Sequence, residues 1–236
     1  MTNQSVIRYG QLLDTVKPAV KRRSKSRRER RKESRPSELL AAALELFVER
    51  GFAATRLDDV AARAGVSKGT LYLYFAGKDD LFKAVVRGGI LPAIANAETL
   101  VREFPGGAGE LLRLVVSGMW SNVGSNLLSG IPKLIIAESG NFPDLARFYY
   151  QEVIQRGLAL MAGILKRGMQ QGEFRTFDVD PTARAMMGPL LLMMLWRHSF
   201  QKHESDPLSA ERYLDSYLAL VLEGLRAPTP REAAAG

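Results

Sequence analysis

TRLDDVAARAGVSKGTLYLYFAGK, the stretch from Thr55 to Lys78, decides how the rest of the chain is interpreted. Thr55 is placed to cap one short helix, and Asp58 follows three residues later, where an acidic side chain completes a capping box. Gly65 then supplies a turn, because glycine adopts positive φ without steric cost. Ser67 can cap a second short helix, which ends on an aromatic cluster. The pattern is typical of a helix-turn-helix.

The second of these helices has one face for a core and one for a partner. Leu71 and Phe75 are four residues apart and are expected to point inward. Gly69 costs up to about 1 kcal/mol relative to alanine inside a helix, and this cost is more easily understood if the backbone must approach a ligand closely. Gly77 and Lys78 open a further helix, whose amino-terminal amides and lysine ammonium could bind a phosphate together. The residues left for the outer surface are Lys68, Gly69, Thr70, Tyr72 and Tyr74.

A wider segment, from about Arg35 to Val86, carries three motifs at set spacing: a helix that ends in ERGF, the run VAARAGVSKGTLYLYF, and K-x-x-L-F. Together they closely resemble the amino-terminal domain of the TetR family of bacterial transcriptional regulators. The resemblance implies that residues 68–74 form a recognition helix, and Leu73 stands where many members have tyrosine. It implies base contacts from Lys68, Gly69, Thr70 and Tyr72, and phosphate contacts from Thr55, Ser67, Tyr74 and Lys78.

Some of these side chains also have a purely structural interpretation. Tyr72, Phe75 and Phe82 could close a small three-helix core, and the sequence favours that role for the two phenylalanines. Ser67 and Thr55 can combine a capping role with a phosphate contact, because a capping hydroxyl keeps hydrogen-bonding capacity to spare.

The positive charge of the chain is concentrated near its beginning. The formal net charge is +8, and the segment from Lys17 to Arg35 alone contains eleven Lys or Arg against Glu29 and Glu33. Residues 1–35 show no sustained apolar period, so we expect a disordered basic arm. The arm either grips phosphates and adds salt-dependent affinity or is a solvated tail, and the sequence leaves both interpretations open.

Composition and motifs argue against several other classes of protein. The chain has no cysteine, and therefore neither a disulfide framework nor a thiolate metal site. No secretory signal is visible, and the longest apolar run, residues 185–196, is shorter than the roughly 20 residues that span a bilayer. The chain has only two histidines and no further ligands at metal spacing, so we expect no metal site. It has no recognisable catalytic motif, so we expect neither a cofactor nor an enzyme. We expect a cytoplasmic, nucleoid-associated protein with no membrane partner.

Helical periodicity extends over the rest of the chain, and no strand-like alternation is long enough to propose a sheet. A first helix is predicted from Pro36 to Arg50 with Ser34 as its cap, and a break is predicted at residues 88–92. Later helices are predicted at 110–122, 131–138, 143–171, 181–198 and 207–226. The predicted fold is all-α, with a basic arm at 1–35, a helix-turn-helix DNA-binding domain at 36–83, a helical bundle for ligand binding and dimerisation at 84–226, and a disordered tail at 227–236.

Apolar residues of the bundle suggest a ligand pocket. Methionine and aromatic side chains recur at helical spacing in residues 143–171 and on the helix at 110–122. Such side chains can line a pocket for an apolar effector, and the same pattern also suits an ordinary bundle core. The candidate pocket residues are Met119, Trp120, Phe148, Met161 and Leu165.

The helix predicted at 181–198 contains MMGPLLLMMLW, which is apolar around its whole circumference, so one face of a monomer cannot bury it. Pro189 should kink this helix. The TetR resemblance implies that the last two helices pair with their copies in a four-helix dimer interface. The candidate interface residues are Leu192, Met193, Leu195, Trp196, Tyr217, Leu218 and Val221.

These observations point to a homodimeric TetR-type transcriptional regulator, a repressor relieved by a small apolar effector. Two heads in a dimer would enter successive major grooves, so the double-stranded operator should be nearly palindromic, with half-sites about one helical turn apart or somewhat more. The other hypothesis is a nonspecific architectural DNA-binding protein driven by the basic arm.

Overall fold

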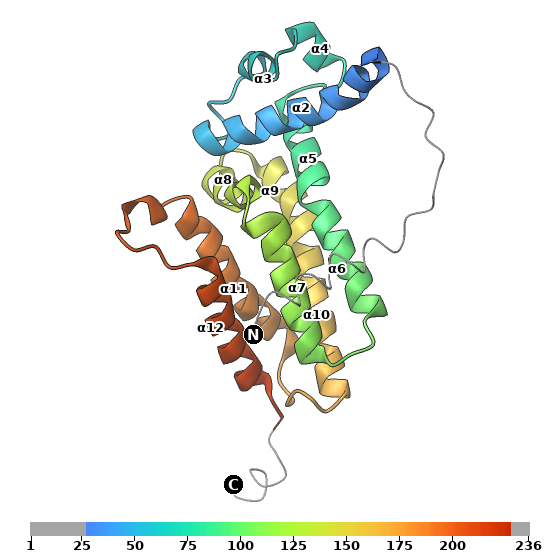
Figure 1. The fold of residues 1–236 in the computed structure, drawn as a ribbon, viewed down its shortest axis with the longest axis vertical. Helices are drawn as coiled ribbons and strands as arrows, with labels where there is room; N and C mark the ends of the chain where they lie inside the picture. The colour runs from blue at the N-terminus through green and yellow to red at the C-terminus, as the bar shows by residue number, and fades with distance from the viewer. Residues whose placement is uncertain (1–26, 228–236) are drawn as a thin grey trace, which may run out of the picture. The chain divides into compact units, whose positions relative to one another are not determined.

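The computed structural model describes residues 27–227 of the chain (Figure 1). Over these residues the secondary structure is helical apart from one isolated bridge between Phe174 and Arg226, so the all-α prediction is confirmed. Residues 1–26, which hold most of the predicted arm, and 228–236 of the predicted tail lie outside the described residues. The chain divides into two units, Met1–Ser37 and Glu38–Gly236, and the contacts described below lie in the second.

Helix α2 spans Arg27–Arg50 and is longer than predicted. The sequence places its start at Pro36 with Ser34 as the cap, but Pro36 lies inside the helix. Residues 27–35 consist largely of Arg, Lys and Glu, which are good helix formers, and their propensity carries the helix past the proline. The prediction that the whole segment 1–35 is disordered is therefore wrong for residues 27–35.

Helix α3 spans Leu57–Arg63, with Arg56 as its cap residue and no side-chain capping bond. Thr55 lies one residue before the cap, and its buried hydroxyl is 3.1 Å from the carbonyl oxygen of Leu46 and 2.7 Å from that of Gly51. The hydroxyl therefore bonds to a carbonyl near the end of α2 and to one just past it, so Thr55 closes the end of that helix. The prediction that Thr55 caps the next helix is wrong, and its hydroxyl is not on the surface where it could reach a phosphate.

The head, as we call residues 36–83, encloses an aromatic core. Phe47, Phe52 and Phe82 are fully buried, with ring centroids between 5.5 and 5.7 Å apart. Leu71 and Phe75 pack inward from the second helix of the predicted pair, as expected. The structural interpretation of Phe75 and Phe82 is confirmed.

Helices α5 (Lys78–Gly89) and α6 (Leu91–Glu103) follow with a single residue between them, so the predicted break at residues 88–92 is confirmed. Together, Lys78–Glu103 are long and apolar enough, by length and composition alone, to cross a membrane. In the structure their apolar side chains are buried in the protein core, among them Leu81, Val85 and Ile94. Core packing accounts for the apolar character of this stretch.

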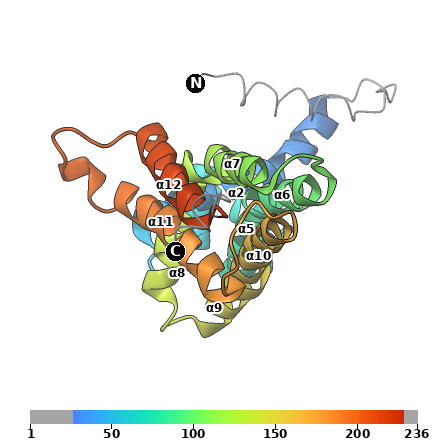
Figure 2. The same ribbon diagram turned by 90° about the horizontal axis from the view of Figure 1, so that it is seen from below.

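The remaining helices form a bundle. Helix α10 packs against α6, α7 and α11, and Figure 2 shows α7, α10 and α6 side by side when viewed along the bundle. Helix α8 packs against α9 and α11. Two π turns, Trp120–Gly124 and Tyr150–Ile154, interrupt the α geometry. The α-helices are α7 (Ala108–Met119), α8 (Gly130–Glu138), α9 (Pro143–Tyr149), α10 (Gln155–Gln170), α11 (Val179–Arg197) and α12 (Ala210–Leu225).

Helix α11 continues through Pro189 from Val179 to Arg197. Two tyrosine hydroxyls of α12 hold it: Tyr213 donates to the carbonyl oxygen of Pro189 at 2.9 Å, and Tyr217 donates to that of Met186 at 2.6 Å. Burial raises the pKa of Tyr217 to about 12, so this hydroxyl remains a donor at physiological pH. The α11–α12 pair is therefore joined by hydrogen bonds as well as by apolar contacts.

Candidate nucleic-acid interface

Helix α4 (Lys68–Tyr72) is set by its flanking residues. Gly65 has a φ of 66°, the positive value that the predicted turn requires. Ser67 caps the helix, because its Oγ accepts a hydrogen bond from the amide of Thr70 at 3.1 Å and lies 2.8 Å from the Thr70 hydroxyl. Leu71 then anchors the helix in the core. Both the turn and the Ser67 cap are confirmed.

The opposite face of α4 is turned to solvent. Tyr72 is 48% exposed and Leu73, the residue that follows the helix, is 84% exposed. A Cβ added to Gly69 would meet only the Ser67 Oγ, at an ordinary distance of 3.9 Å. Packing within the described chain therefore gives no reason for a glycine there, which leaves close approach of an external partner as the physical explanation.

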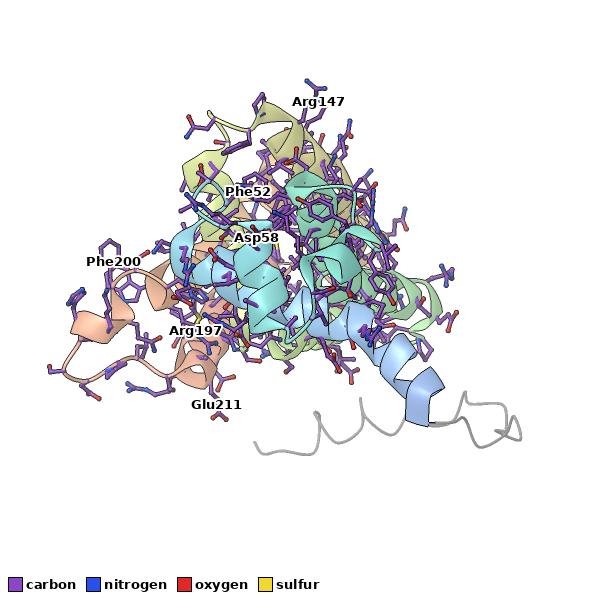
Figure 3. The ribbon with its side chains drawn as sticks, turned by 90° about the horizontal axis from the view of Figure 1, so that it is seen from above. Phe52, Asp58, Arg147, Arg197, Phe200 and Glu211 are labelled. Carbon is purple, nitrogen blue, oxygen red and sulfur yellow. The ribbon has the colours of Figure 1, made fainter. Side chains whose placement is uncertain are left out.

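Lys68 is not a free charge on this face. Its Nζ lies 2.8 Å from Asp58 Oδ1, across from α3 to α4, and this hydrogen bond raises the pKa of the lysine. Figure 3, which looks onto the α3 and α4 side of the head, shows Asp58 on that face. Asp58 was expected in a capping box. In the structure its carboxylate instead pairs with Lys68, which is predicted to contact bases.

Lys78 begins α5 and is half-buried. Its Nζ donates to the carbonyl oxygen of Ala53 at 2.9 Å and lies 4.6 Å from the centre of the Phe52 ring. Burial lowers the pKa of Lys78, while the carboxylates of Asp79 and Glu138 act in the opposite direction. An ammonium group has three donors, so a phosphate could still bind to the two that Ala53 does not use.

The predicted DNA-contacting residues of the head are accessible to solvent, with one exception. Thr55 is the exception, because its side chain is buried. Tyr74 is half-buried, with its ring 6.4 Å from that of Phe75. The residues that are fully or partly exposed are Ser67, Lys68, Gly69, Thr70, Tyr72, Tyr74 and Lys78.

The residues predicted for the dimer surface differ in their exposure. Leu192 and Trp196 are exposed on α11, whereas Met193, Leu195 and Val221 are half-buried. Tyr217 and Leu218 are buried within the chain, where α12 packs against its own bundle, so their side chains are not available to a partner as predicted. Further exposed apolar residues lie on the same two helices and in the loop between them: Leu191, Phe200, Leu208 and Leu220.

A groove of about 480 Å³ runs between α11, the 201–210 segment and the first π turn. Trp120, Leu192 and Trp196 contribute apolar walls, and Arg197 and Glu204 contribute charge. Of the five candidate pocket residues, Trp120 lines this groove, while Met119 is half-buried. The other three are buried in the apolar core: Phe148, Met161 and Leu165.

Two family models match the chain. Residues 39–85, which include the exposed face of α4, match a model described as "Bacterial regulatory proteins, tetR family". Residues 110–223 match a model described as "AefR-like transcriptional repressor, C-terminal domain".

Curated relatives align over most of the chain. The fatty acid metabolism regulator protein of Bacillus subtilis is 29% identical over 199 residues, which cover 82% of this chain and 98% of the relative. The HTH-type transcriptional repressor KstR2 of Mycobacterium tuberculosis is 28% identical over 196 residues, which cover 81% and 93%. Both relatives are named as regulators and neither as an enzyme.

Solved structures that resemble the chain are also of transcriptional regulators. The transcriptional regulator FadR from Bacillus subtilis, in complex with stearoyl-CoA, superposes with a TM-score of 0.68 at 26% identity over 80% of this chain and 99% of that one. The ketosteroid transcriptional regulator KstR2 of Mycobacterium tuberculosis superposes with a TM-score of 0.66 at 25% identity over 83% and 96%.

Proposed function

Because the chain belongs to the TetR family of bacterial transcriptional regulators, we propose that it is a repressor that binds a specific operator as a homodimer and releases it on binding a small apolar effector. The carrying observation is the outward face of α4, where exposed Tyr72 and the open space beside Gly69 stand above a closed aromatic core. A glycine inside a helix and an exposed tyrosine lower the stability of the protein, and no internal packing compensates for them. Both are explained if this face of α4 enters the major groove of DNA.

The apolar surface of α11 and α12 supports the homodimer. Leu192, Trp196 and Leu220 are large apolar side chains that stay exposed in one chain, and Leu220 is 77% exposed. Covering such a surface with a second copy would remove it from water at roughly 25 cal/mol per Å². A two-fold dimer would present two α4 helices to a near-palindromic site with half-sites roughly 34–36 Å apart or somewhat more.

The nature of the effector is proposed from the relatives and from the core of the bundle. One structural relative was solved with stearoyl-CoA and another is a ketosteroid regulator, and both kinds of molecule have large apolar parts. In this chain the five candidate pocket residues lie in or against one apolar core, which is a surrounding of the kind that such molecules favour: Met119, Trp120, Phe148, Met161 and Leu165.

Tyr149 adds a polar group to this environment. Its side chain is buried, and burial raises the pKa of its hydroxyl. A tyrosine hydroxyl both donates and accepts hydrogen bonds, so Tyr149 can bind a carbonyl or hydroxyl oxygen of the effector.

Selection of bound DNA from a random pool tests the function directly. The proposal predicts enrichment of one sequence with two-fold symmetry, and enrichment of no sequence would overturn it. A second measurement uses a chain that lacks residues 1–35, the whole of the basic arm. A specific regulator keeps its preference for operator over random DNA while its salt dependence falls, whereas a binder driven by the basic arm loses nearly all affinity.

A further inference from the structure

The carboxy-terminal end of α8 contacts the turn that joins α2 to α3. The Glu138 carboxylate accepts a hydrogen bond from the backbone amide of Ala53, with Oε1 at 3.1 Å from the nitrogen. The ring of Phe142, just after α8, packs edge-on against Phe52 with centroids 4.7 Å apart. Gly51 opens the turn with a φ of 85°, and a Cβ on it would lie 3.4 Å from the same Glu138 oxygen. The turn is thus fitted closely around the end of α8.

The same turn holds Lys78. The carbonyl oxygen of Ala53 accepts the hydrogen bond from Lys78 Nζ, and the Phe52 ring lies under the ammonium. Both backbone polar groups of Ala53 are therefore hydrogen-bonded. The amide donates to Glu138, and the carbonyl accepts from Lys78. The position of the Lys78 ammonium depends on a turn that Glu138 fixes.

The other end of α8 is attached to α11. Ser129 Oγ lies 2.8 Å from His198 Nε2, and Lys133 Nζ donates to the carbonyl oxygen of His198 at 2.6 Å. Figure 1 shows α8 beside the end of α2, between the head and the bundle helices. Helix α8 therefore has polar contacts to the proposed dimer helix at one end and to the head at the other.

We propose that Glu138 is a positioning residue for DNA binding, which acts through the Ala53 peptide groups to hold Lys78 where it contacts an operator phosphate. The inference rests on the proposed function and adds the device by which the state of the bundle reaches the DNA-binding surface. Movement of α8 away from the turn would release the Ala53 amide and loosen the ammonium that the carbonyl holds.

Simple electrostatics predicts the opposite effect of removing this carboxylate. Glu138 is a negative charge near a surface that binds a polyanion, so its loss alone should strengthen binding to all DNA. If Glu138 acts by holding the turn, its loss should instead weaken operator binding. The sign of the change therefore separates the two explanations.

The experiment measures operator affinity of the full chain as a function of salt concentration, with the operator obtained by selection. Glu138→Ala is expected to lower affinity on the order of three- to tenfold, which corresponds to the net contribution of one typical hydrogen bond. Glu138→Gln keeps an oxygen acceptor for the Ala53 amide and is expected to stay within about twofold of the wild type. Glu103→Ala, at an exposed position on the last turn of α6, removes the same charge without touching the head and is expected to cause no loss.

A double-mutant cycle with Lys78→Ala tests whether Glu138 acts through Lys78. If Glu138 acts through Lys78, adding Glu138→Ala to Lys78→Ala should change affinity by less than about twofold. Each single variant should also lower the slope of log affinity against log salt by up to about 1, and the double variant by no more than Lys78→Ala alone. Additive losses would overturn the inference.

Failure of this inference can be told apart from failure of the proposed function. An operator that the wild type and Glu138→Ala bind equally well, or that the variant binds more tightly, would overturn the role of Glu138 alone. Selection that enriches no operator would overturn the proposed function itself. Thermal unfolding of each variant, monitored by circular dichroism, identifies a loss of fold. If Glu138→Ala does not fold, Glu138→Gln still separates the two explanations, because binding more than about twofold tighter than that of the wild type would show that only the charge of Glu138 matters.

Discussion

Lys68 and Asp58 form an ion pair between α4 and α3, with 2.8 Å between Nζ and Oδ1. A lysine expected to face bases is thereby paired within the free protein, and DNA must compete with the carboxylate for it. Exposed ion pairs contribute little to folding, so the pair is better understood as a restraint on the lysine before DNA binds. Removal of this ion pair should therefore change the affinity for DNA more than it changes the free energy of unfolding.

Asp58→Asn is therefore expected to strengthen binding to operator and to random DNA alike, by up to about fivefold, because a competing negative charge is lost. Fluorescence anisotropy titrations at fixed salt measure both affinities. Weaker binding to operator by the variant would show that Asp58 orients Lys68 for contact.

Tyr72→Ala is expected to weaken operator binding by about 1–3 kcal/mol and to narrow the gap between operator and random DNA. The side chain is 48% exposed, so its truncation should leave the melting temperature nearly unchanged. Tyr150→Ala is the matched control, because Tyr150 is 45% exposed on the bundle. Equal operator affinity of the Tyr72 variant and the control would contradict the assignment of α4.

Leu192→Glu is expected to give monomers in sedimentation velocity at micromolar concentration, because a charge would be buried in the proposed interface. Ile136→Glu is the control: Ile136 and Leu192 are each 54% exposed, but Ile136 lies on α8. A Leu192 variant that sediments as a stable dimer would exclude this surface as the interface.

His198 is expected to make stability depend on pH. Burial, and then the charges of Arg197 and Lys133, hold the pKa of His198 below its ordinary value of 6.5. Below about pH 6.5 the unfolded chain therefore binds a proton that the folded chain resists, and stability falls as pH drops through that window. His198→Gln should show a smaller loss of melting temperature between pH 7.5 and 5.5 than the wild type does. His203→Gln, at an exposed position, is the comparison.

The features marked by strong local signals were predictable from the sequence. Gly65, Ser67 and Pro143 each impose a backbone conformation or a capping bond that depends on a few neighbouring residues, and all three lie where they were expected. The apolar period likewise identified which face of α4 is buried.

Other features depend on contacts that no local pattern carries. A hydroxyl before a helix looks the same in sequence whether it caps that helix or closes the preceding one, and only the nearby carbonyls of Leu46 and Gly51 decide the role of Thr55. Periodicity shows that Tyr217 is on an apolar face but cannot say whether the covering surface belongs to the same chain. The bond from Ala53 to Glu138 joins residues 85 positions apart, beyond the reach of any local rule.

The π turn at Tyr150–Ile154 marks a place where the gene for this protein can lose a codon. A π turn closes after one residue more than an α turn, so the chain from Pro143 to Gln170 carries one extra residue there. In an uninterrupted α-helix that residue would rotate every later side chain by about 100°, but the π turn absorbs it, so Phe148, Met161 and Leu165 all lie in the core. Deletion of a single codon within the turn would restore continuous α geometry and leave this register unchanged, whereas the same deletion later in α10 would turn the residues after it away from the core.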